Sequence, residues 1–450
     1  MLDKAAERAL MSKVTWRLIP FMFILYIVAY LDRVNVGFAK LHMQGALGAD
    51  FSETVFGTGM GIFFLGYFLL EVPSNLIMEK VGARPWIARI MITWGLLAAA
   101  MMFVRTVPWF YGMRFALGLA EAGFFPGMIL YLTYWFPAAE RARAVGKFMT
   151  ATAIANILGG PFSAWLLGFH GIMGLEGWQW LFLLQGLPAC VLGIIVLFYL
   201  PNGPKDAKWL TPVERDWILA RMKSEGAASS HKHANLGDAF KSPKVWLLCL
   251  IYFAQATGSY GFTFWLPSIL KGTYHVTDQV TGFMVAVPFI AATFGLVLIG
   301  ASSDRTHERR KHVAGAALWG AFWVAFAAIL LIPNLVPLPD NTKLILAYVG
   351  FVLAPFGMSG TLGPFWAIPN TVLAGSAAAG GIAMINSVGN LGGYVGGVAL
   401  GKLKDMGFAY TGGLFVVAGA YLLLAVLALC VQMPKVEHPV TMPDAVPEAA

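Results

Sequence analysis

The sequence predicts an all-α polytopic membrane protein, with twelve transmembrane helices arranged as two pseudo-symmetric six-helix bundles. Of its 450 residues, 58% are hydrophobic and only 12% are charged, and the mean hydropathy is +0.70. Soluble domains carry about 25% charged residues. A polar stretch, residues 201–243, divides the apolar windows into two sets of six. The windows are too long and too uniformly apolar for outer-membrane strands, so we expect helices.

The windows follow one another with short polar connections, and each has the roughly 20 apolar residues that a spanning helix needs. They are expected near residues 18–38, 54–78, 85–104, 108–136, 145–168, 178–200, 245–270, 280–300, 313–332, 343–366, 372–399 and 409–431. The first bundle is therefore expected over 1–200, a linker over 201–243 and the second bundle over 244–432. The tail, 433–450, is rich in proline and acidic residues and is expected to be disordered.

The linker contains the beginning of a helix. Thr211 is a candidate N-cap, Pro212 stands at the first helical position and Glu214 lies three residues after the cap. The apolar residues Val213, Trp217 and Ile218 then form a short stripe. We expect this stripe to rest on the bundle or at the membrane surface.

The basic residues indicate the orientation. Most of the 31 Lys and Arg residues lie in segments that face the cytoplasm if both termini do, whereas Lys40 is among the few expected in external loops. This asymmetry predicts cytoplasmic termini, and it explains the net charge of +8 without a nucleic-acid partner. The three cysteines lie in predicted spans, so no disulfide or thiolate metal site is predicted. The first segment continues as a full span without a cleavage site, so we predict no removable signal peptide.

Two patterns recur about half the chain apart. Ala153-x-x-Asn156-x-x-Gly159 in the fifth window returns as Ala383-x-x-Asn386-x-x-Gly389 in the eleventh. Charged loops also recur after the second and eighth windows, and we expect them to act as gating loops that join neighbouring helices in one conformation. The residues are Glu79, Lys80, Arg84, Asp304 and Arg305. A duplicated six-helix unit is a transporter architecture, with substrate held near the midplane between the halves.

Charged residues inside the spans occur only in the first half. A charged side chain costs about 2.5 to 3.5 kcal/mol at the bilayer centre, so it persists mainly where it faces a cavity or a partner. Arg114 and Glu121 are two helical turns apart and project from one face, which favours a polar cavity lined by that face. The alternative is a buried ion pair that ties helices together, with Asp32 as the partner across helices.

Three further charges are open to structural interpretations. Asp32 and Arg33 could anchor the external end of the first span at the membrane interface. Glu71 lies about two turns before the end of its helix, and we expect it to reach the headgroup level or to pair with Lys or Arg. It is therefore assigned a structural role.

The second half supplies uncharged polar side chains instead. Asn386, Asn390 and Tyr394 are spaced four residues apart and form one polar stripe. Hydrogen bonding between closely packed helices is the alternative explanation for this stripe. Asn386 is expected to face its repeat partner Asn156 across the pseudo-two-fold axis.

These motifs resemble a known family. The twelve spans, the loop after the second span and the segment from Arg114 to Pro126 (RFALGLAEAGFFP) resemble the major facilitator superfamily. The segments YLDRVN, residues 30–35, and NSVGNLGG, residues 386–393, resemble its anion:cation symporter family, over about residues 15–432. That family includes carriers of tartrate, sugar acids, phthalate, nicotinate and hydroxyphenylacetate, so the resemblance implies a small organic carboxylate as substrate.

The resemblance also implies roles for individual positions. Asp32 and Glu121 would be the protonation sites, and Arg114 would couple protonation to conformation. Arg33 and Tyr30 would contact the anionic substrate. The remaining pocket residues would be Tyr67, Asn156, Asn386 and, from the polar stripe, Asn390.

We expect proton-coupled uptake by a monomer in the bacterial cytoplasmic (inner) membrane, driven by the proton motive force with no cofactor or metal. A guanidinium matches a carboxylate bidentately, and our hypothesis is that protonation of Asp32 frees Arg33 for the substrate, while deprotonation of Glu121 resets the cycle. An exporter or antiporter would share this fold and is the alternative. Gly159-Gly160-Pro161 resembles a fragment of an antiporter signature, but Phe162-Ser163-Ala164 follow in place of its further glycines. The sequence has no nucleophile, metal-ligand or phosphate-loop pattern, so no enzyme is predicted.

Overall fold

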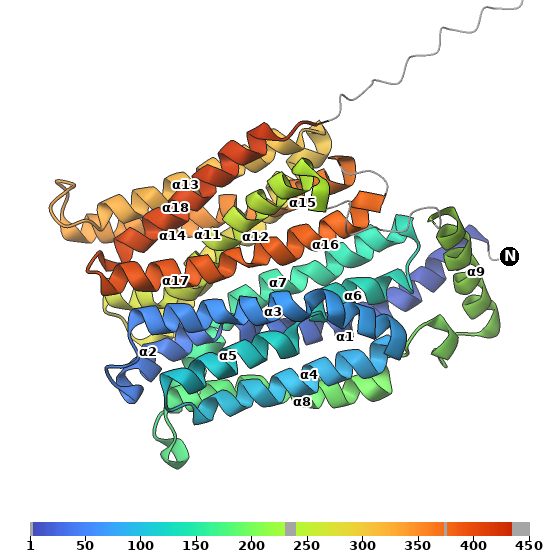
Figure 1. Cartoon of the computed structure of the whole chain (residues 1–450), viewed down its shortest axis with the longest axis horizontal. Coiled ribbons are helices and arrows are strands. Elements are labelled where there is room, and N and C mark those ends of the chain that lie inside the picture. Colours follow the sequence, from blue (N-terminus) through green and yellow to red (C-terminus); the bar gives the residue numbers. More distant parts are fainter. Residues whose placement is uncertain (1–2, 230–239, 373–375, 434–450) are drawn as a thin grey trace, which may run out of the picture.

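Long helices lie side by side in a computed structural model that describes residues 3–229, 240–372 and 376–433 (Figure 1). The first group comprises α1 (Lys4–Val34), α2 (Val36–Leu47), α3 (Glu53–Val81), α4 (Ala83–Ala100), α5 (Val107–Glu121), α6 (Phe124–Thr133), α7 (Ala138–Leu167) and α8 (Gly177–Tyr199). The second comprises α11 (Pro243–Tyr274), α12 (Asp278–Thr306), α13 (Arg309–Leu330), α14 (Asp340–Gly360), α15 (Leu362–Val372), α16 (Ser376–Asn390), α17 (Gly392–Asp405) and α18 (Ala409–Cys430). Short 3-10 turns occur at Met101–Phe103, Ile172–Gly174 and Pro204–Asp206.

The linker helix α9 (Pro212–Ser229) lies across one end of the bundle, near the N-terminus (Figure 1). We call this end the inner end, because the positive-inside pattern predicts that it faces the cytoplasm, and the opposite end the outer end. The sequence correctly predicts the start of α9, where Thr211 and Glu214 form reciprocal capping hydrogen bonds of 2.8 and 3.3 Å. Ile218 is buried as the apolar stripe predicts, whereas Val213 is exposed.

An ion pair docks α9 on the first helix. Lys13 Nζ lies 2.8 Å from a Glu214 carboxylate oxygen. Partial desolvation raises the pKa of the Glu214 carboxyl, but the bond from Lys13 and the bonds with Thr211 outweigh it and hold that pKa below its usual value. The linker is therefore held against the inner end of α1.

Ten stretches within the described residues are long and apolar enough to cross a membrane. They correspond to ten of the twelve predicted windows; the fifth and eleventh, 145–168 and 372–399, do not reach the same apolarity. The eleventh also includes residues 373–375, which lie outside the described ranges. The helices α7 and α17 are rich in small and polar residues because they pack against the other group, α7 on α12 and α17 on α3. The count of twelve spans and the orientation of the termini remain predictions.

The first apolar window is much shorter than the helix that contains it. With a minor break at Asn35, α1 and α2 form a continuous stretch of 44 residues from Lys4 to Leu47. The predicted window 18–38 lies inside this stretch, and the helix continues beyond it through α2. Asp32 and Arg33 therefore lie well inside the stretch and not at its outer end.

The fourth span is broken directly after Glu121. Ala122 and Gly123 separate α5 from α6, and Gly123 has a φ of +84°. A Cβ at this position would overlap the Ser74 side chain of α3. The left-handed backbone and the close approach to α3 both require glycine. The break leaves the Glu121 carboxylate at the C-terminal end of a helix, where the helix dipole disfavours negative charge.

The two groups of helices approach each other closely along two seams. One seam joins α3 to α17 and α16, and the other joins α7 to α12, while α2 contacts α11. At the second seam Gly160 and Gly282 are in backbone contact, and a Cβ on either glycine would overlap the carbonyl oxygen of the other. Small residues allow this approach between membrane helices. The interior between the seams is where charged residues of the first group can meet polar residues of the second, such as Tyr260 and Ser387.

We predict that Gly123→Ala destabilises the protein by about 1 to 2 kcal/mol, because alanine is strained at positive φ and its methyl group meets Ser74. Thermal unfolding of the purified protein measures this. Gly112→Ala is the matched control in α5, since a Cβ there meets nothing within 4 Å. The control should leave the unfolding temperature unchanged or raise it. An equal loss in both variants would contradict the role assigned to the break.

Candidate functional site

Four charged side chains meet in the interior of the first group of helices. Asp32 and Arg33 come from α1, and Arg114 and Glu121 come from α5. Asp32 is 1% exposed, and Arg114 and Glu121 are fully buried. Two acids and two arginines give a neutral cluster when all four are ionised. The proximity that the sequence predicts for these residues is present, but their pairing differs from our hypothesis.

Arg33 pairs with Glu121 and not with Asp32. The Arg33 Nε donates to Glu121 Oε1 at 3.1 Å, and its Nη2 donates to the same oxygen. The second carboxylate oxygen of Glu121 has no partner among the described residues. The part of our hypothesis that makes Asp32 the acid that releases Arg33 is therefore not supported, because Glu121 holds the guanidinium.

Arg33 also reaches the second group of helices. Its Nη1 donates to the Tyr260 hydroxyl of α11 at 3.4 Å. The guanidinium lies over two rings of α3, 5.6 Å from the centroid of Phe63 and 5.3 Å from that of Tyr67. Cation–π contacts of this kind stabilise a desolvated cation. Arg33 is thus a cation at the junction of the two groups, and Tyr67 is beside it as the resemblance implies.

Asp32 is buried, which excludes the alternative that it anchors the outer membrane interface. Its Oδ1 accepts a hydrogen bond from Asn35 Nδ2 at 3.2 Å, and its Oδ2 has no partner among the described residues. The indole of Trp94 lies nearby without reaching hydrogen-bond geometry. Asp32 is therefore a buried acid that faces the same cluster but does not hold Arg33.

Arg114 has no ion-pair partner among the described residues. Its Nε donates to the Gly59 carbonyl oxygen at 3.0 Å, and its guanidinium lies 5.2 Å from the Phe63 centroid. Both terminal nitrogens lack a hydrogen-bond partner in the described chain. An unsatisfied buried polar group costs about 1 to 3 kcal/mol, and more when charged. The alternative of an ion pair with Asp32 is not what the structure shows, and Arg114 retains donors that can serve a neighbouring carboxylate in another arrangement.

Glu71 differs most from its prediction. It is 3% exposed and does not reach a headgroup or pair with Lys or Arg. Instead Ser387 Oγ donates to one carboxylate oxygen at 2.6 Å, and Asn386 Nδ2 donates to the other. Both partners belong to α16, in the other group of helices. We call this set the inner contact, because Glu71 lies one turn closer to the inner end than Tyr67.

The remaining predicted pocket residues divide between the two groups. Tyr30 lies next to Asn156, whose amide donates to the Thr152 carbonyl oxygen at 2.9 Å. Asn386 binds Glu71 and not Asn156, so the expectation that the two asparagines face each other is wrong. Asn390 makes no side-chain hydrogen bond among the described residues. The repeat therefore aligns Asn156 with Asn386 in the sequence, but their side chains do not meet in the structure.

The outer end is closed by a second set of bonds, which we call the outer contacts. Lys40 is 3% exposed, lies 2.8 Å from Glu53 and donates to Ser268 at 3.3 Å, so its predicted place in an external loop is wrong. His42 lies 2.6 Å from Asp278, which also pairs with Lys271. Asp405 accepts from the backbone N–H groups of Glu53 and Thr54, at 3.2 and 2.7 Å. These contacts join α2 and α3 to α11, α12 and α17.

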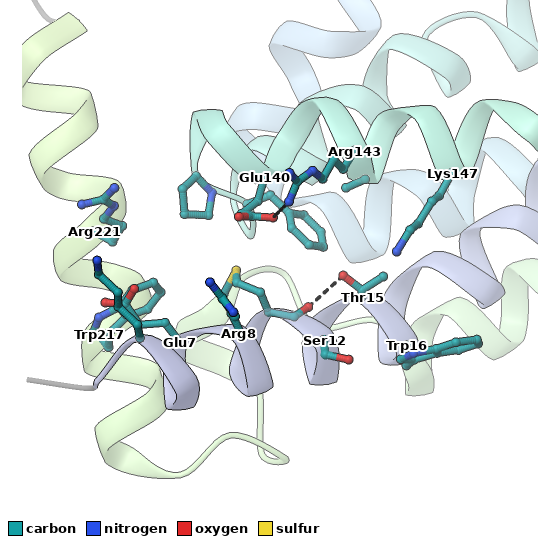
Figure 2. Close-up of a pocket in the computed structure, with 15 residues that line it drawn as sticks. Glu7, Arg8, Ser12, Thr15, Trp16, Glu140, Arg143, Lys147, Trp217 and Arg221 are labelled. Atoms are coloured by element: carbon teal, nitrogen blue, oxygen red, sulfur yellow. Dashed lines mark hydrogen bonds and ion pairs between the residues drawn. The ribbon is translucent and has the colours of Figure 1, made fainter. Parts of the chain in front are cut away.

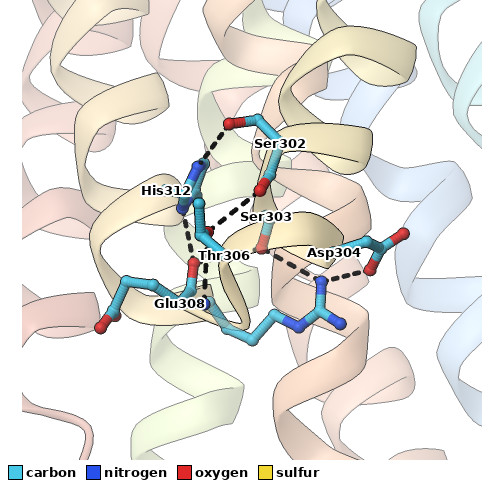
Figure 3. Close-up of polar contacts among 7 residues, drawn as sticks. Ser302, Ser303, Asp304, Thr306, Glu308 and His312 are labelled. Atoms are coloured by element: carbon cyan, nitrogen blue, oxygen red, sulfur yellow. Dashed lines mark hydrogen bonds and ion pairs between the residues drawn. The ribbon is translucent and has the colours of Figure 1, made fainter.

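The predicted gating loops lie at the inner end and are locally bonded. Figure 3 shows the turn between α12 and α13, where Arg309 binds Asp304 and Ser303, the latter at 3.1 Å. In the same turn the Ser302 hydroxyl lies 3.0 Å from His312 Nε2. Arg305 takes no part in these bonds. In the first group the Arg84 backbone N–H donates to Asn202 at 3.0 Å, while Glu79 and Lys80 are exposed and unpaired among the described residues. The loops do not join the two groups in this conformation.

Bonds between the groups therefore lie on both sides of Arg33. A cavity beside the cluster, lined by Val34, Asn156 and Thr263 among others, holds only about 10 Å³, which is room for about one water molecule. This cavity can hold an organic anion only if the two groups move apart. Within the described ranges no set of three or more His, Cys, Asp or Glu side chains could hold a metal ion.

Two packed groups of apolar helices, with buried charges at their junction and separate contacts on each side, define a multi-span membrane transporter. The chain belongs to the Major Facilitator Superfamily, which it matches over residues 22–397. It is 47% identical over 427 residues to a protein of Agrobacterium vitis named "Putative tartrate transporter", covering 94% of this chain and 91% of that protein. It is 40% identical over 422 residues to a "Quinolone resistance transporter" of Acinetobacter baumannii, covering 94% and 93%.

The fold is also that of solved transporters. A bacterial homologue of the human lysosomal transporter Spinster, in an inward-facing and unoccupied conformation, superimposes with a TM-score of 0.71 at 18% identity, covering 93% of this chain and 96% of that one. The family assignment agrees with the resemblance carried by the motifs around Arg33, Glu121 and Asn386. The chain is accordingly a transporter and not an enzyme.

We predict that the inner contact controls access from the inner end. In a variant with Cys190, Cys249 and Cys430 replaced by serine and Thr263→Cys in the central cavity, Ser387→Ala removes one bond to Glu71. If the closed inner end loses about 1.4 kcal/mol of stability relative to the open one, labelling by an impermeant thiol reagent at that end would rise about tenfold. The measurement is the labelling rate in inside-out vesicles.

Ser163→Ala is the matched control. Ser163 is a buried serine that accepts a hydrogen bond from Gln185 at 3.0 Å, and both residues belong to the first group of helices. Its loss should leave the labelling rate unchanged, since it joins no helices across the junction. Equal rates in the Ser387 and Ser163 variants would show that the inner contact does not close the pathway.

Proposed function

We propose that this transporter carries a small organic carboxylate into the cell together with a proton, by alternating access across the bacterial cytoplasmic membrane. The proposal includes a monomer with twelve spans and cytoplasmic termini, driven by the proton motive force. The observation that carries it is the buried ion pair between Arg33 and Glu121. The Glu121 carboxylate binds the Arg33 guanidinium, which is the cation that a carboxylate substrate would need.

The substrate and Glu121 would compete for the same guanidinium. If a substrate carboxylate takes the place of Glu121 on Arg33, the Glu121 carboxylate is left buried without a cation. An uncompensated buried charge costs several kcal/mol, whereas a protonated carboxyl is neutral and can donate to a neighbour. Substrate binding would therefore favour proton uptake at Glu121. One carboxylate and one proton enter together, and the cluster keeps its net charge.

Asp32 and Arg114 provide the second step. The free oxygen of Asp32 and the free terminal nitrogens of Arg114 lie in the same cluster and can pair if Glu121 becomes neutral. Arg114 would then compensate Asp32 while Arg33 compensates the substrate. This exchange of partners links the proton on Glu121 to the position of α5 relative to α1.

Alternating access would follow from opening one set of contacts at a time. The outer contacts connect the halves through Lys40, His42 and Asp405, and the inner contact connects them through Glu71. Arg33 lies between the two sets. Since Asn386 holds Glu71 and is also a predicted substrate ligand, a substrate that engages the Asn386 amide would loosen the inner contact and favour release to the cytoplasm.

The substrate class is drawn from the site and from the relatives. A guanidinium between Tyr67, Tyr260 and amide side chains suits a hydroxy acid, since hydroxyls and amides pair with its hydroxyl groups. The name of the Agrobacterium vitis relative supports tartrate as the first compound to test. Sugar acids, nicotinate, phthalate and hydroxyphenylacetate form the rest of the panel.

An exporter or antiporter of organic anions is the second candidate. The name of the Acinetobacter baumannii relative, at 40% identity, favours it, since resistance is consistent with removal of a compound from the cell. Proteoliposomes with an imposed inward proton gradient discriminate the two. Uptake with the gradient supports symport, and uptake that requires an opposite gradient supports export.

We predict that Glu121→Gln abolishes proton-driven accumulation of the best-binding carboxylate but retains exchange of substrate across the membrane. Glutamine resembles the protonated acid, so Arg33 stays available while no proton can leave. Uptake and counterflow in proteoliposomes measure both activities. Glu176→Gln, at a half-buried acid outside the site that pairs with His170 at 2.9 Å, is the control and should retain both. Accumulation by the Glu121 variant that still follows the proton gradient would contradict the proposal.

A further inference from the structure

A second, larger cavity lies at the inner end, away from the charged cluster. It is enclosed by the first turns of α1, the first turns of α7 and the linker helix α9, and Figure 2 shows the side chains that line it. Its volume is about 500 Å³, within the range of small-molecule sites, roughly 300 to 1,000 Å³. None of the residues assigned to transport lines it.

The cavity is strongly basic. Its lining includes Lys4, Arg8, Arg143, Lys147 and Arg221 but only two acids, Glu7 and Glu140. Glu140 lies 3.7 Å from Arg143 and offsets that charge in part. In the described parts of the chain, Lys4, Arg8 and Lys147 form no ion pair. The walls therefore carry positive charge that the protein does not neutralise.

Basic and hydroxyl groups approach the cavity from two helices. Figure 2 shows Lys147 extending from α7 toward Thr15 and Trp16 of α1, and Arg8 extending from α1 toward α7. Ser12 adds a hydroxyl to the same wall. Arginine, lysine and hydroxyl groups are the donors that bind phosphate oxygens.

The position of Trp16 relates the cavity to the membrane. Its side chain is 76% exposed at the edge of the cavity, immediately before the first apolar window begins near residue 18. Tryptophan is enriched at the membrane–water interface, at the level of the lipid headgroups. With Trp16 at this interface, the Trp16 and Lys147 end of the cavity would be level with the phospholipid phosphates, and the Lys4 end would extend toward the aqueous phase.

We propose that this cavity binds the phosphate headgroup of an anionic phospholipid of the cytoplasmic leaflet, with Arg8 and Lys147 as its main cationic contacts. The positive-inside rule explains basic residues at the inner end, but it does not explain their convergence on one cavity from separate helices. Basic pockets between membrane helices on this side are suited to anionic headgroups. A bound headgroup would also contact the wall formed by Trp217 of α9, and so would strengthen the docking of the linker that Lys13 and Glu214 provide.

The test compares lipid binding by two double variants of the full chain. Arg8→Gln/Lys147→Gln removes the two proposed contacts, and Lys205→Gln/Lys208→Gln removes two exposed charges from the linker outside the cavity. Purified protein in neutral detergent is titrated with phosphatidylglycerol, with phosphatidylcholine, and with inorganic phosphate. Thermal unfolding and native mass spectrometry report stabilisation and the number of bound lipids. Unfolding without added lipid verifies that both variants fold.

We expect phosphatidylglycerol to stabilise the wild-type protein and the linker control, and to bind the cavity variant about 10-fold to 30-fold more weakly, at about 1 kcal/mol per lost basic residue. Phosphatidylcholine should have little effect on any of them. An equal loss in both double variants would overturn the proposal, because general surface charge would then account for binding. Stabilisation by inorganic phosphate but not by phosphatidylglycerol would show that the cavity binds a soluble anion, and would overturn the proposal that its ligand is a lipid headgroup.

Discussion

The ion pair between Arg33 and Glu121 is the interaction on which the rest of this structure depends. Both groups are removed from bulk water, where an unpaired charge costs several kcal/mol, so each requires the other or a replacement of like charge. The end of α5 at Glu121 adds to this requirement, because the C-terminal end of a helix disfavours negative charge. The requirement explains why a carboxylate substrate and a proton are natural replacements for the two partners.

The inner and outer contacts, on either side of this ion pair, link it to the opening and closing of the two ends. Each set joins the two groups of helices through hydrogen bonds or ion pairs, so neither opens without losing them. The inner contact and the cluster share a boundary, because Glu71 lies one turn from Tyr67 and Tyr67 packs on Arg33. A change of partner at Arg33 would therefore alter the packing of Tyr67, one helical turn from Glu71 in the inner contact.

The sequence predicts the fold and the members of the cluster well because both follow from the membrane environment. Long apolar windows require helices, and charges such as Arg114 and Glu121 are costly enough inside them to mark functional positions. Pairing cannot be obtained in this way, since Arg33 could reach Asp32 or Glu121 depending on how α1 and α5 pack. For the same reason the sequence does not predict the partners of Glu71, since Asn386 and Ser387 lie on the other half of the chain. The apolar windows predict a loop at Lys40 because they do not reveal that α2 continues the first helix.

The central claim is that substrate replaces Glu121 on Arg33 and that Glu121 then takes up a proton. Proton uptake on tartrate binding, or on binding of the tightest carboxylate of the panel, tests it most directly, using purified protein in weakly buffered solution with a pH indicator. We expect uptake of about one proton per substrate bound by the wild-type protein and none by Glu121→Gln. Binding without proton uptake by the wild-type protein, or equal uptake by the variant, would contradict it.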